Sequence, residues 1–412
     1  MATRLPSGSP RLLRRLNSAA VLDAIRRGGP VSRTELAGMT GLSKPTVNDL
    51  VQVLLDGGYV TESSPDGVGR PRRPGRRARL LRFRSDLGYV LGIDIGANKT
   101  LALVSDLDGQ PLAIERRRTT AAERADAGAL LRKVRSVAGA ALSRAGVAPE
   151  LLHAVGVGTP GVVDPVSGSV TLATVDALEG VRLGPRLARS FACPVLVDNE
   201  VHLSLLAERW RGAAEGIDNA FYVQIGVGIG GGILIGGDVY RGAAGAAGEV
   251  GFLPLFDVEA PSDRLGPFEH AAGGSAFARL GRRAAERHPG SALARVAGGR
   301  DAIDAEAVFA AAAAGDAAAG EVLDELVERL ARGIAAAVVV LNPATVIVGG
   351  GISRAGEQLL GRLERRITEL VPVPSRIALS TLGDEAVALG AVRLALQAVE
   401  ERLFAVTAVA PA

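Results

Sequence analysis

The sequence predicts an α/β protein in two parts: a short, mainly helical head and a larger body in which strands and helices alternate. Three observations support this division. Basic residues concentrate at the N-terminal end, the apolar pattern changes from helical to mixed near Tyr89, and glycine-rich turns then recur at the ends of apolar segments. A chain of 412 residues can bury more than one core. We therefore expect one domain at 1–88 and a second at 89–412.

Composition excludes several classes of protein. Cys193 is the single cysteine, so neither an internal disulfide nor a thiolate metal cluster can form. Its apolar neighbours favour a small buried side chain. No apolar run approaches the ~18–20 residues that cross a bilayer, and the first residues lack a secretory signal. We expect a cytoplasmic protein without a membrane partner.

The charge of the chain is uneven. Residues 1–85 hold 16 Lys and Arg against 6 Asp and Glu, whereas the whole chain carries a net charge of only +3. A basic segment on a mildly acidic remainder indicates that only this segment binds a polyanion.

Three helical segments are expected in the head. Leu16, Val21 and Ile25 give the first an apolar stripe, and residues 33–39 form the second. A tight turn follows at Gly41, where glycine tolerates a left-handed backbone.

The third segment, which begins at the N-cap Ser43, separates an apolar face from a polar one. Its apolar face consists of Val47, Leu50, Val51, Leu54 and Leu55. Its polar face consists of Pro45, Thr46, Asn48, Asp49 and Gln52. A DNA recognition helix needs short polar side chains toward the base edges, and Lys44 with the helix N-terminus suits phosphate contacts.

A β-wing is predicted next, because residues 58–83 suggest a strand, a Gly/Pro loop and a second strand. The arginines at its tip are Arg70, Arg72, Arg73, Arg76 and Arg77. Such arginines contact the DNA backbone or enter a minor groove; the alternative is a solvated basic linker. Together these features predict binding to double-stranded DNA. Two heads on a two-fold axis would read a palindromic operator, so we expect a homodimer or homotetramer.

Three glycine-rich turns follow strands of the body. They contain Asp94, Gly96 and Asn98 in the first, Gly226, Gly228 and Gly230 in the second, and Gly350 in the third. Backbone amides in such turns can face a phosphate, although ordinary structural turns look the same. Their order along the chain is more specific than any single turn.

With the segments "GVGTPGVVD" and "VYRGAAGAAGEVGFLPL" and the basic head, these turns resemble the ROK family of sugar kinases and transcriptional repressors over about nine-tenths of the chain. The resemblance implies an N-terminal winged helix-turn-helix and a two-lobed, actin-like ATPase (ribonuclease-H-like) body. The smaller lobe would span about 89–200 plus a C-terminal helix at about 384–404, and the larger lobe about 201–383.

Departures from the family pattern weigh against catalysis. The kinases place an aspartate base in an N-D-x-N segment, where this chain has Asn199, Glu200 and His202. The extra methylene of glutamate moves the carboxylate by roughly 1 Å, and such a shift can cost about 10²-fold in rate. The resemblance therefore assigns no catalytic residue, unless Glu200 acts as the base.

The zinc ligands of the family are also missing. Its histidine and three cysteines correspond to Phe252, Ala260, Ser262 and Pro267 here. We expect no zinc, no requirement for ATP, and local packing in place of the metal. The residues expected to pack are Phe252, Leu255, Phe256 and Phe268.

Two sugar-contacting glutamates of the family remain, Glu249 and Glu269, and with Asn199 and Glu200 they would hold a sugar or sugar phosphate. The sequence thus predicts a DNA-binding transcriptional repressor of sugar or secondary metabolism genes. One alternative is an active ATP-dependent sugar kinase that also binds DNA. Another is a regulator that no longer senses a small molecule, which the substitutions at Val175, Glu200, His202 and Phe252 would explain.

Overall fold

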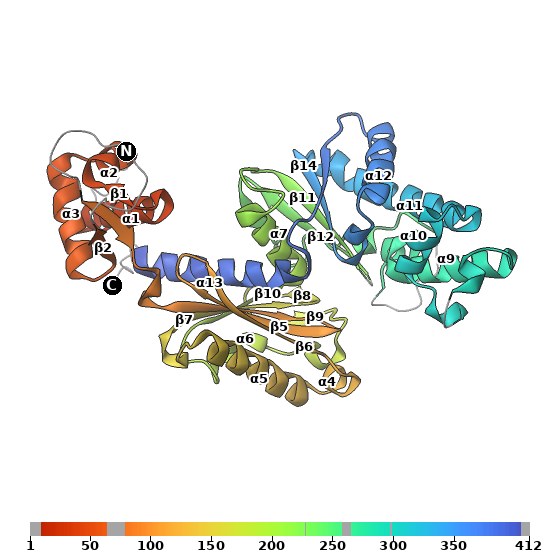
Figure 1. Ribbon diagram of the computed structural model, residues 1–412, viewed down its shortest axis with the longest axis horizontal. Helices are drawn as coiled ribbons and strands as arrows, with labels where there is room; N and C mark the ends of the chain where they lie inside the picture. The colour runs from red at the N-terminus through yellow and green to blue at the C-terminus, as the bar shows by residue number, and fades with distance from the viewer. Residues whose placement is uncertain (1–9, 64–78, 227, 258–264, 297–298, 405–412) are drawn as a thin grey trace, which may run out of the picture.

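The computed structural model describes residues 10–63, 79–226, 228–257, 265–296 and 299–404. A small head lies at one end of the molecule, and two α/β lobes make up the rest (Figure 1). None of the helices in this described part combines the length and apolar character that a bilayer crossing needs.

The head is a winged helix-turn-helix. Its elements are α1 (Pro10–Gly28), β1 (Val31–Ser32), α2 (Arg33–Thr40), α3 (Lys44–Asp56), β2 (Val60–Ser63) and β3 (Leu80–Phe83). The strands form an antiparallel sheet in the order β1-β3-β2. The three helices and two wing strands confirm the predicted pattern, and the two-residue strand β1 adds to it.

Local sequence signals set the boundaries of the head helices. Ser32 and Glu35 form a capping box at the start of α2, and Gly41 ends that helix with a φ of 68°. The Ser43 hydroxyl accepts the backbone amide of Thr46 at 3.3 Å and begins α3. The apolar face of α3 is buried at Val47, Leu50, Val51 and Leu54, as its spacing predicts.

The smaller lobe is built on a five-stranded sheet in the order β10-β7-β4-β5-β6. Its strands are β4 (Tyr89–Ile95), β5 (Lys99–Asp106), β6 (Pro111–Arg118), β7 (Leu152–Thr159) and β10 (Val195–Asn199). Helices α4 (Ala121–Ala125), α5 (Ala127–Ala145) and α6 (Leu183–Ala188), and the hairpin β8 (Val162–Val163) and β9 (Val170–Thr171), complete it. The C-terminal helix α13 (Ala386–Phe404) covers the sheet face opposite α5 (Figure 1).

The larger lobe repeats this plan with the sheet order β13-β12-β11-β14-β15. Its strands are β11 (Ala220–Ile225), β12 (Ile229–Ile235), β13 (Asp238–Tyr240), β14 (Thr345–Gly349) and β15 (Arg376–Leu379). Its helices are α7 (Glu200–Arg211), α8 (Pro267–Ala272), α9 (Gly274–Arg287), α10 (Ala305–Ala313), α11 (Ala317–Leu341) and α12 (Glu357–Leu370). In each lobe an antiparallel hairpin is followed by parallel strands, which is the repeated α/β plan expected for the body.

Helix α13 lies unusually close to its neighbours. A Cβ at Gly390 would lie 1.9 Å from the Leu203 carbonyl oxygen of α7, and one at Gly156 would lie 2.0 Å from the Ala391 carbonyl oxygen. Glycine at these positions therefore lets the α13 backbone rest directly on α7 and on β7. Helix α13 therefore packs against the sheet of the smaller lobe and against α7 of the larger lobe.

We expect Gly390→Ala to lower the free energy of unfolding by about 3 kcal/mol, because backbone atoms cannot move aside as a side-chain end can. The matched control is Gly320→Ala in α11, where no atom lies within 4 Å of the added methyl group. That change should stabilise the protein by up to about 1 kcal/mol. Chemical denaturation measures both, and equal effects would contradict the packing of α13.

Candidate functional site

The candidate DNA-binding surface is the exposed face of α3. Lys44, Pro45, Asn48 and Gln52 are exposed there, and Thr46 is half-buried. The Ser43 hydroxyl caps the helix, so its side chain has a structural role in addition to any phosphate contact. Gln52 donates to the Asp56 carboxylate at 2.8 Å. The predicted wing-tip residues Arg70, Arg72, Arg73 and Arg76 lie outside the described residues.

In the body, four acidic residues from four elements form one site. Asp94 lies near the end of β4, Glu200 begins α7, Glu249 precedes the turn Val250–Phe252, and Glu269 lies in α8. The charges of Asp94 and Glu249 raise the pKa of Glu200, and the charge of Glu249 raises that of Glu269. Lys99 is a cation beside this group, with its Nζ 3.8 Å from the Asp94 carboxylate.

Two of these acids have pKa values near neutrality. Burial raises the pKa of Glu200 to about 7, and the charges of Asp94 and Glu249 add to the effect. Lys99 and a 3.2 Å hydrogen bond from the Gln224 amide oppose it. Burial likewise raises the pKa of Asp94 to about 6. Carboxyl groups in this range both donate and accept hydrogen bonds, which suits the hydroxyl groups of a polyol.

Glu269 connects two features that the sequence suggested separately. Burial raises its pKa, while hydrogen bonds from the backbone amides of Gly266 and Ile229 oppose the rise. A Cβ at Gly228 would lie 1.7 Å from a carboxylate oxygen of Glu269. The expected sugar-binding glutamate therefore lies directly on the second glycine turn, and any larger residue at position 228 would displace its carboxylate.

The glycine turns use part of their hydrogen-bonding capacity internally. The Gly96 amide donates to the Lys99 carbonyl oxygen at 2.8 Å, and the Gly226 amide to the Gly228 carbonyl oxygen at 2.9 Å. Gly350 has a φ of 82°, and a Cβ there would meet the backbone of Ile225. These glycines are explained by backbone geometry, so their role in phosphate binding stays a prediction.

The remaining turn residues lie at the surface or pack inside. Asn98 is exposed at the tip of the β4–β5 turn. Gly230 faces Val201 of α7, where a Cβ would come within 2.8 Å of its side chain. Gly230 therefore serves the packing of α7 on β12.

Asn199 is the N-cap of α7. Its side-chain oxygen accepts the amides of Val201 at 2.7 Å and His202 at 3.2 Å, and its side-chain nitrogen donates to the Gly161 carbonyl oxygen at 2.9 Å. This leaves one amide hydrogen for a ligand. Its principal task is to orient the start of α7, which carries Glu200.

Sequence reasoning missed a buried polar cluster next to this site. His202 lies 3.1 Å from the Asp198 carboxylate, which also pairs with Arg241 at 2.6 Å. Burial favours a higher pKa for Asp198, but His202 and Arg241 hold that pKa below its ordinary value. The spacing of Asp198 and His202, four residues apart, is visible in the sequence. Nothing in the sequence indicates that Arg241 joins them.

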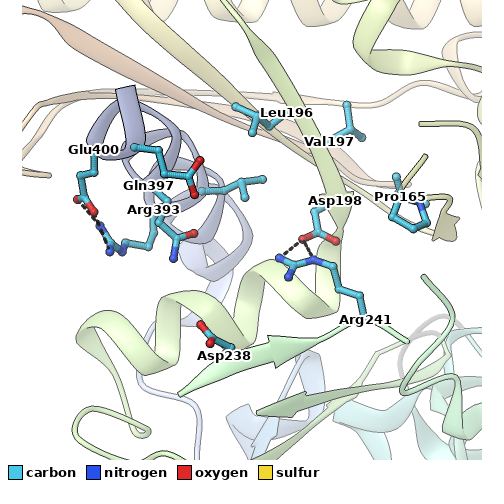
Figure 2. Close-up of a pocket in the computed structure, with 12 residues that line it drawn as sticks. Pro165, Leu196, Val197, Asp198, Asp238, Arg241, Arg393, Gln397 and Glu400 are labelled. Atoms are coloured by element: carbon cyan, nitrogen blue, oxygen red, sulfur yellow. Dashed lines mark hydrogen bonds and ion pairs between the residues drawn. The ribbon is translucent and has the colours of Figure 1, made fainter. Parts of the chain in front are cut away.

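A cavity of about 530 Å³ lies behind this cluster, between both lobes and α13. Figure 2 shows the Asp198–Arg241 pair on one side and the Arg393–Glu400 pair of α13 on the other. The predicted effector residues Glu200, Glu249 and Glu269 do not line it. It is therefore distinct from the group of four acids.

The packing expected in place of zinc is half right. Phe268 is buried and stacks on Phe256 with ring centroids 6.1 Å apart. Phe252 and Leu255, however, are 36% and 40% exposed, so their predicted burial is wrong. The short turn Val250–Phe252 puts Gly251 inside, where the backbone approaches Glu269, packs Val250 against the core and leaves Phe252 exposed.

Of the four positions that correspond to zinc ligands, Ala260 and Ser262 lie outside the described residues. Within the described ranges, no group of three or more His, Cys, Asp or Glu side chains is arranged to hold a metal ion.

Comparison with known proteins agrees with this arrangement. Residues 90–398 match the ROK family, and residues 15–71 match the MarR family. The chain is 29% identical to the xylose repressor of Caldicellulosiruptor bescii over 395 residues, which are 94% of this chain and 97% of that protein.

Two solved structures extend the comparison. One is a ROK family transcriptional regulator, a homologue of the Escherichia coli MLC protein, with a TM-score of 0.79 and 23% identity over 95% of this chain and 98% of that chain. The other is a ROK family glucokinase from Streptomyces griseus in complex with glucose and AMPPNP, with a TM-score of 0.66 and 27% identity over 75% of this chain and all of that chain.

The fold and site define a winged helix-turn-helix protein with an actin-like, sugar-kinase-type body. The chain belongs to the ROK family. These findings confirm the predicted family, the winged head and the class of DNA-binding transcriptional regulator. The relatives of this chain include glucokinases as well as repressors.

Proposed function

We propose that the protein is a transcriptional repressor of sugar or secondary metabolism genes whose body binds a sugar or sugar phosphate. The observation that carries this proposal is the combination of an exposed recognition helix with the acidic group of Asp94, Glu200, Glu249 and Glu269. The similarity to a xylose repressor along nearly the whole chain supports it. So does the likeness of the body to a glucokinase that binds glucose.

Helix α13 offers a route from this acidic group to the head. Just before the helix begins, the Asp384 carbonyl oxygen accepts a hydrogen bond from Lys99 at 2.6 Å. Near its other end, Glu400 pairs with Arg393 and also with Arg26 of α1, each at 2.6 Å. Phe83 packs both in the head core and against the α13 cluster. A ligand that changes the closure of the lobes would therefore move the head.

In a two-fold dimer such a movement changes the separation of the two recognition helices, and with it the fit to a palindromic operator. The size of the effect is limited by the difference in ligand affinity between the two lobe arrangements. Selection from a random DNA library with the full chain, with and without D-xylose or D-glucose, tests this proposal. A selected sequence without two-fold symmetry would count against the dimeric arrangement.

We further propose that the body does not phosphorylate sugars and needs neither ATP nor zinc. Within the site, Glu200 favours a kinase, because a carboxyl group with a pKa near 7 suits a general base. A coupled ATPase assay with D-glucose, D-xylose and N-acetylglucosamine should show no sugar-dependent turnover. Turnover that Glu200→Ala abolishes would establish the kinase instead.

We expect Glu249→Ala to remove the thermal stabilisation that a sugar effector gives to the wild type. A ligand at a hundred times its Kd stabilises the native state by about 2.7 kcal/mol, so loss of one buried carboxylate contact should be easily measured. The control is Glu364→Ala, which changes an exposed glutamate on α12. Differential scanning fluorimetry with D-xylose, D-glucose and N-acetylglucosamine gives the result. Equal shifts in both variants would exclude Glu249 from the site.

A further inference from the structure

The segment that leads to Glu249 is held at two points, by Asp198 of β10 and by His202 of α7. At its beginning, Arg241 donates to the Asp198 carboxylate at 2.8 Å through Nε. At its end, Nε2 of His202 lies 3.0 Å from the Ala247 carbonyl oxygen. The Ala247 amide in turn donates to the Arg241 carbonyl oxygen at 3.1 Å, which closes the segment into a loop.

Both ring nitrogens of His202 face hydrogen-bond acceptors. Nδ1 lies 3.1 Å from the Asp198 carboxylate, and Nε2 faces a carbonyl oxygen, which has no proton to give. Asp198 is ionised because His202 and Arg241 hold its pKa below the ordinary value. Both hydrogen bonds therefore exist together only when each ring nitrogen carries a hydrogen.

The link from Ala247 to Glu249 leaves little freedom. Gly248 lies between them with a φ of 93°, and its carbonyl oxygen accepts the Gly231 amide of β12 at 2.7 Å. A Cβ at Gly248 would lie 2.1 Å from the Gly231 carbonyl oxygen. Gly248 is the one residue between Ala247 and Glu249, and its close packing on β12 leaves the two little room to move independently.

We propose that His202 is a positioning residue: in its doubly protonated form it holds Ala247 in place and so directs Glu249 toward Glu200, and deprotonation releases this hold. The part of the proposal that concerns ligand affinity rests on the proposed function. The part that concerns the loop does not.

The hydrogen-bond geometry around His202 determines the sign of the effect. Asp198 from β10 and Glu249 from the loop carry negative charge near the ring, and Arg241 carries positive charge beside Asp198. The closed loop gives the second ring hydrogen an acceptor, the Ala247 carbonyl oxygen, which the open loop lacks. The closed loop is therefore favoured at low pH and is lost as pH rises. The carbonyl bond breaks first, since the neutral ring keeps its hydrogen on the side of the carboxylate.

Two substitutions separate the two hydrogen bonds. The side-chain amide of glutamine reaches about as far as Nε2 of histidine, so His202→Gln keeps a donor for Ala247 that does not titrate. The amide of asparagine reaches only about as far as Nδ1, so His202→Asn keeps the contact with Asp198 and loses that with Ala247. Asparagine is also the residue that the kinase pattern has at this position.

Hydrogen exchange of the full chain, corrected for intrinsic rates, tests the loop directly. In the wild type the amides of residues 241–250 should be about tenfold better protected at pH 6 than at pH 8.5. His202→Gln should show equal protection at both values, and His202→Asn low protection at both. The interior of α11 is the internal reference. The proposal is overturned if protection in the wild type does not change with pH, or if the amides of residues 241–250 are well protected in His202→Asn. If His202→Asn does not fold, the comparison of the wild type with His202→Gln decides.

Titration calorimetry with D-xylose and D-glucose tests the consequence for the ligand. Between pH 6 and 8.5 the affinity of the wild type for sugar should fall about tenfold more than the affinity of His202→Gln. Both proteins keep Glu200, so its contribution to the pH dependence cancels when the two are compared. If neither sugar binds while the exchange pattern holds, the proposed function fails and the loop mechanism stands. If sugar binds with the same pH dependence in both proteins, the positioning of Glu249 is refuted.

Discussion

Replacing Asn48 and Gln52 together by alanine should weaken binding to the selected operator by about 10²-fold or more, while binding to unrelated DNA stays nearly unchanged. Both side chains are exposed on the face of α3 that turns away from the head core. A well-placed amide contact with a base edge contributes about 1–3 kcal/mol of discrimination. Gln52 must give up its 2.8 Å bond to Asp56 to reach a base, which reduces its share. Fluorescence anisotropy with specific and scrambled duplexes measures both affinities.

Lys44→Ala provides the matched comparison on the same helix. Its side chain carries charge without base information, so its loss should weaken binding to every sequence alike. The slope of log K against log salt should fall by about 0.9, one phosphate's share. If the Asn48 and Gln52 double variant, like Lys44→Ala, weakens binding to the operator and to unrelated DNA by the same factor, α3 does not read the base sequence.

Glu200→Gln should stabilise the protein by about 3 kcal/mol at pH 8.5 and by less than about 1 kcal/mol at pH 5. Burial raises the pKa of Glu200 to about 7 from an unfolded value near 4.5. The folded state therefore binds the proton more tightly. The stability that the protonated group contributes is complete below about pH 4.5 and is lost as pH rises through 7. Glutamine stays neutral and still accepts the hydrogen bond from Gln224.

Urea denaturation of wild type and variant between pH 5 and 8.5 measures this difference. Asp94 still titrates in the variant, with a pKa raised by its own burial, so part of the pH dependence should remain. Glu364→Gln on α12 removes an exposed carboxylate and should leave the pH profile unchanged. A Glu200→Gln profile parallel to that of the wild type would mean that Glu200 is ionised without cost.

Local signals in the sequence were sufficient for the head. The N-cap at Ser43, the left-handed turn at Gly41 and the apolar spacing of α3 depend on neighbours within a few residues, so each could be predicted without knowing the fold. The glycine turns of the body were found for the same reason. Phe252 shows the limit of such reasoning, because its direction depends on how Gly251 packs against Glu269.

The body site required contacts between distant segments. Glu269 and Gly228 are 41 residues apart and touch because α8 packs beside the β11–β12 turn. His202 and Ala247 are 45 residues apart, and Arg26 reaches Glu400 from the opposite end of the chain. No local pattern encodes such pairs, since each arises from the packing of elements whose order in space differs from their order in sequence.

The sequence by itself determined that a basic N-terminal segment with a recognition helix precedes a kinase-like body without the expected metal ligands, because side-chain type and short-range spacing are sufficient for those inferences. Only the tertiary structure decided which of the predicted residues share a site. Burial beside other carboxylates raises the pKa of Glu200, the Gly228 turn seats Glu269, and His202 holds the loop of Glu249. These properties depend on desolvation and on hydrogen-bond geometry, which exist only after the two lobes have folded around α7 and α13.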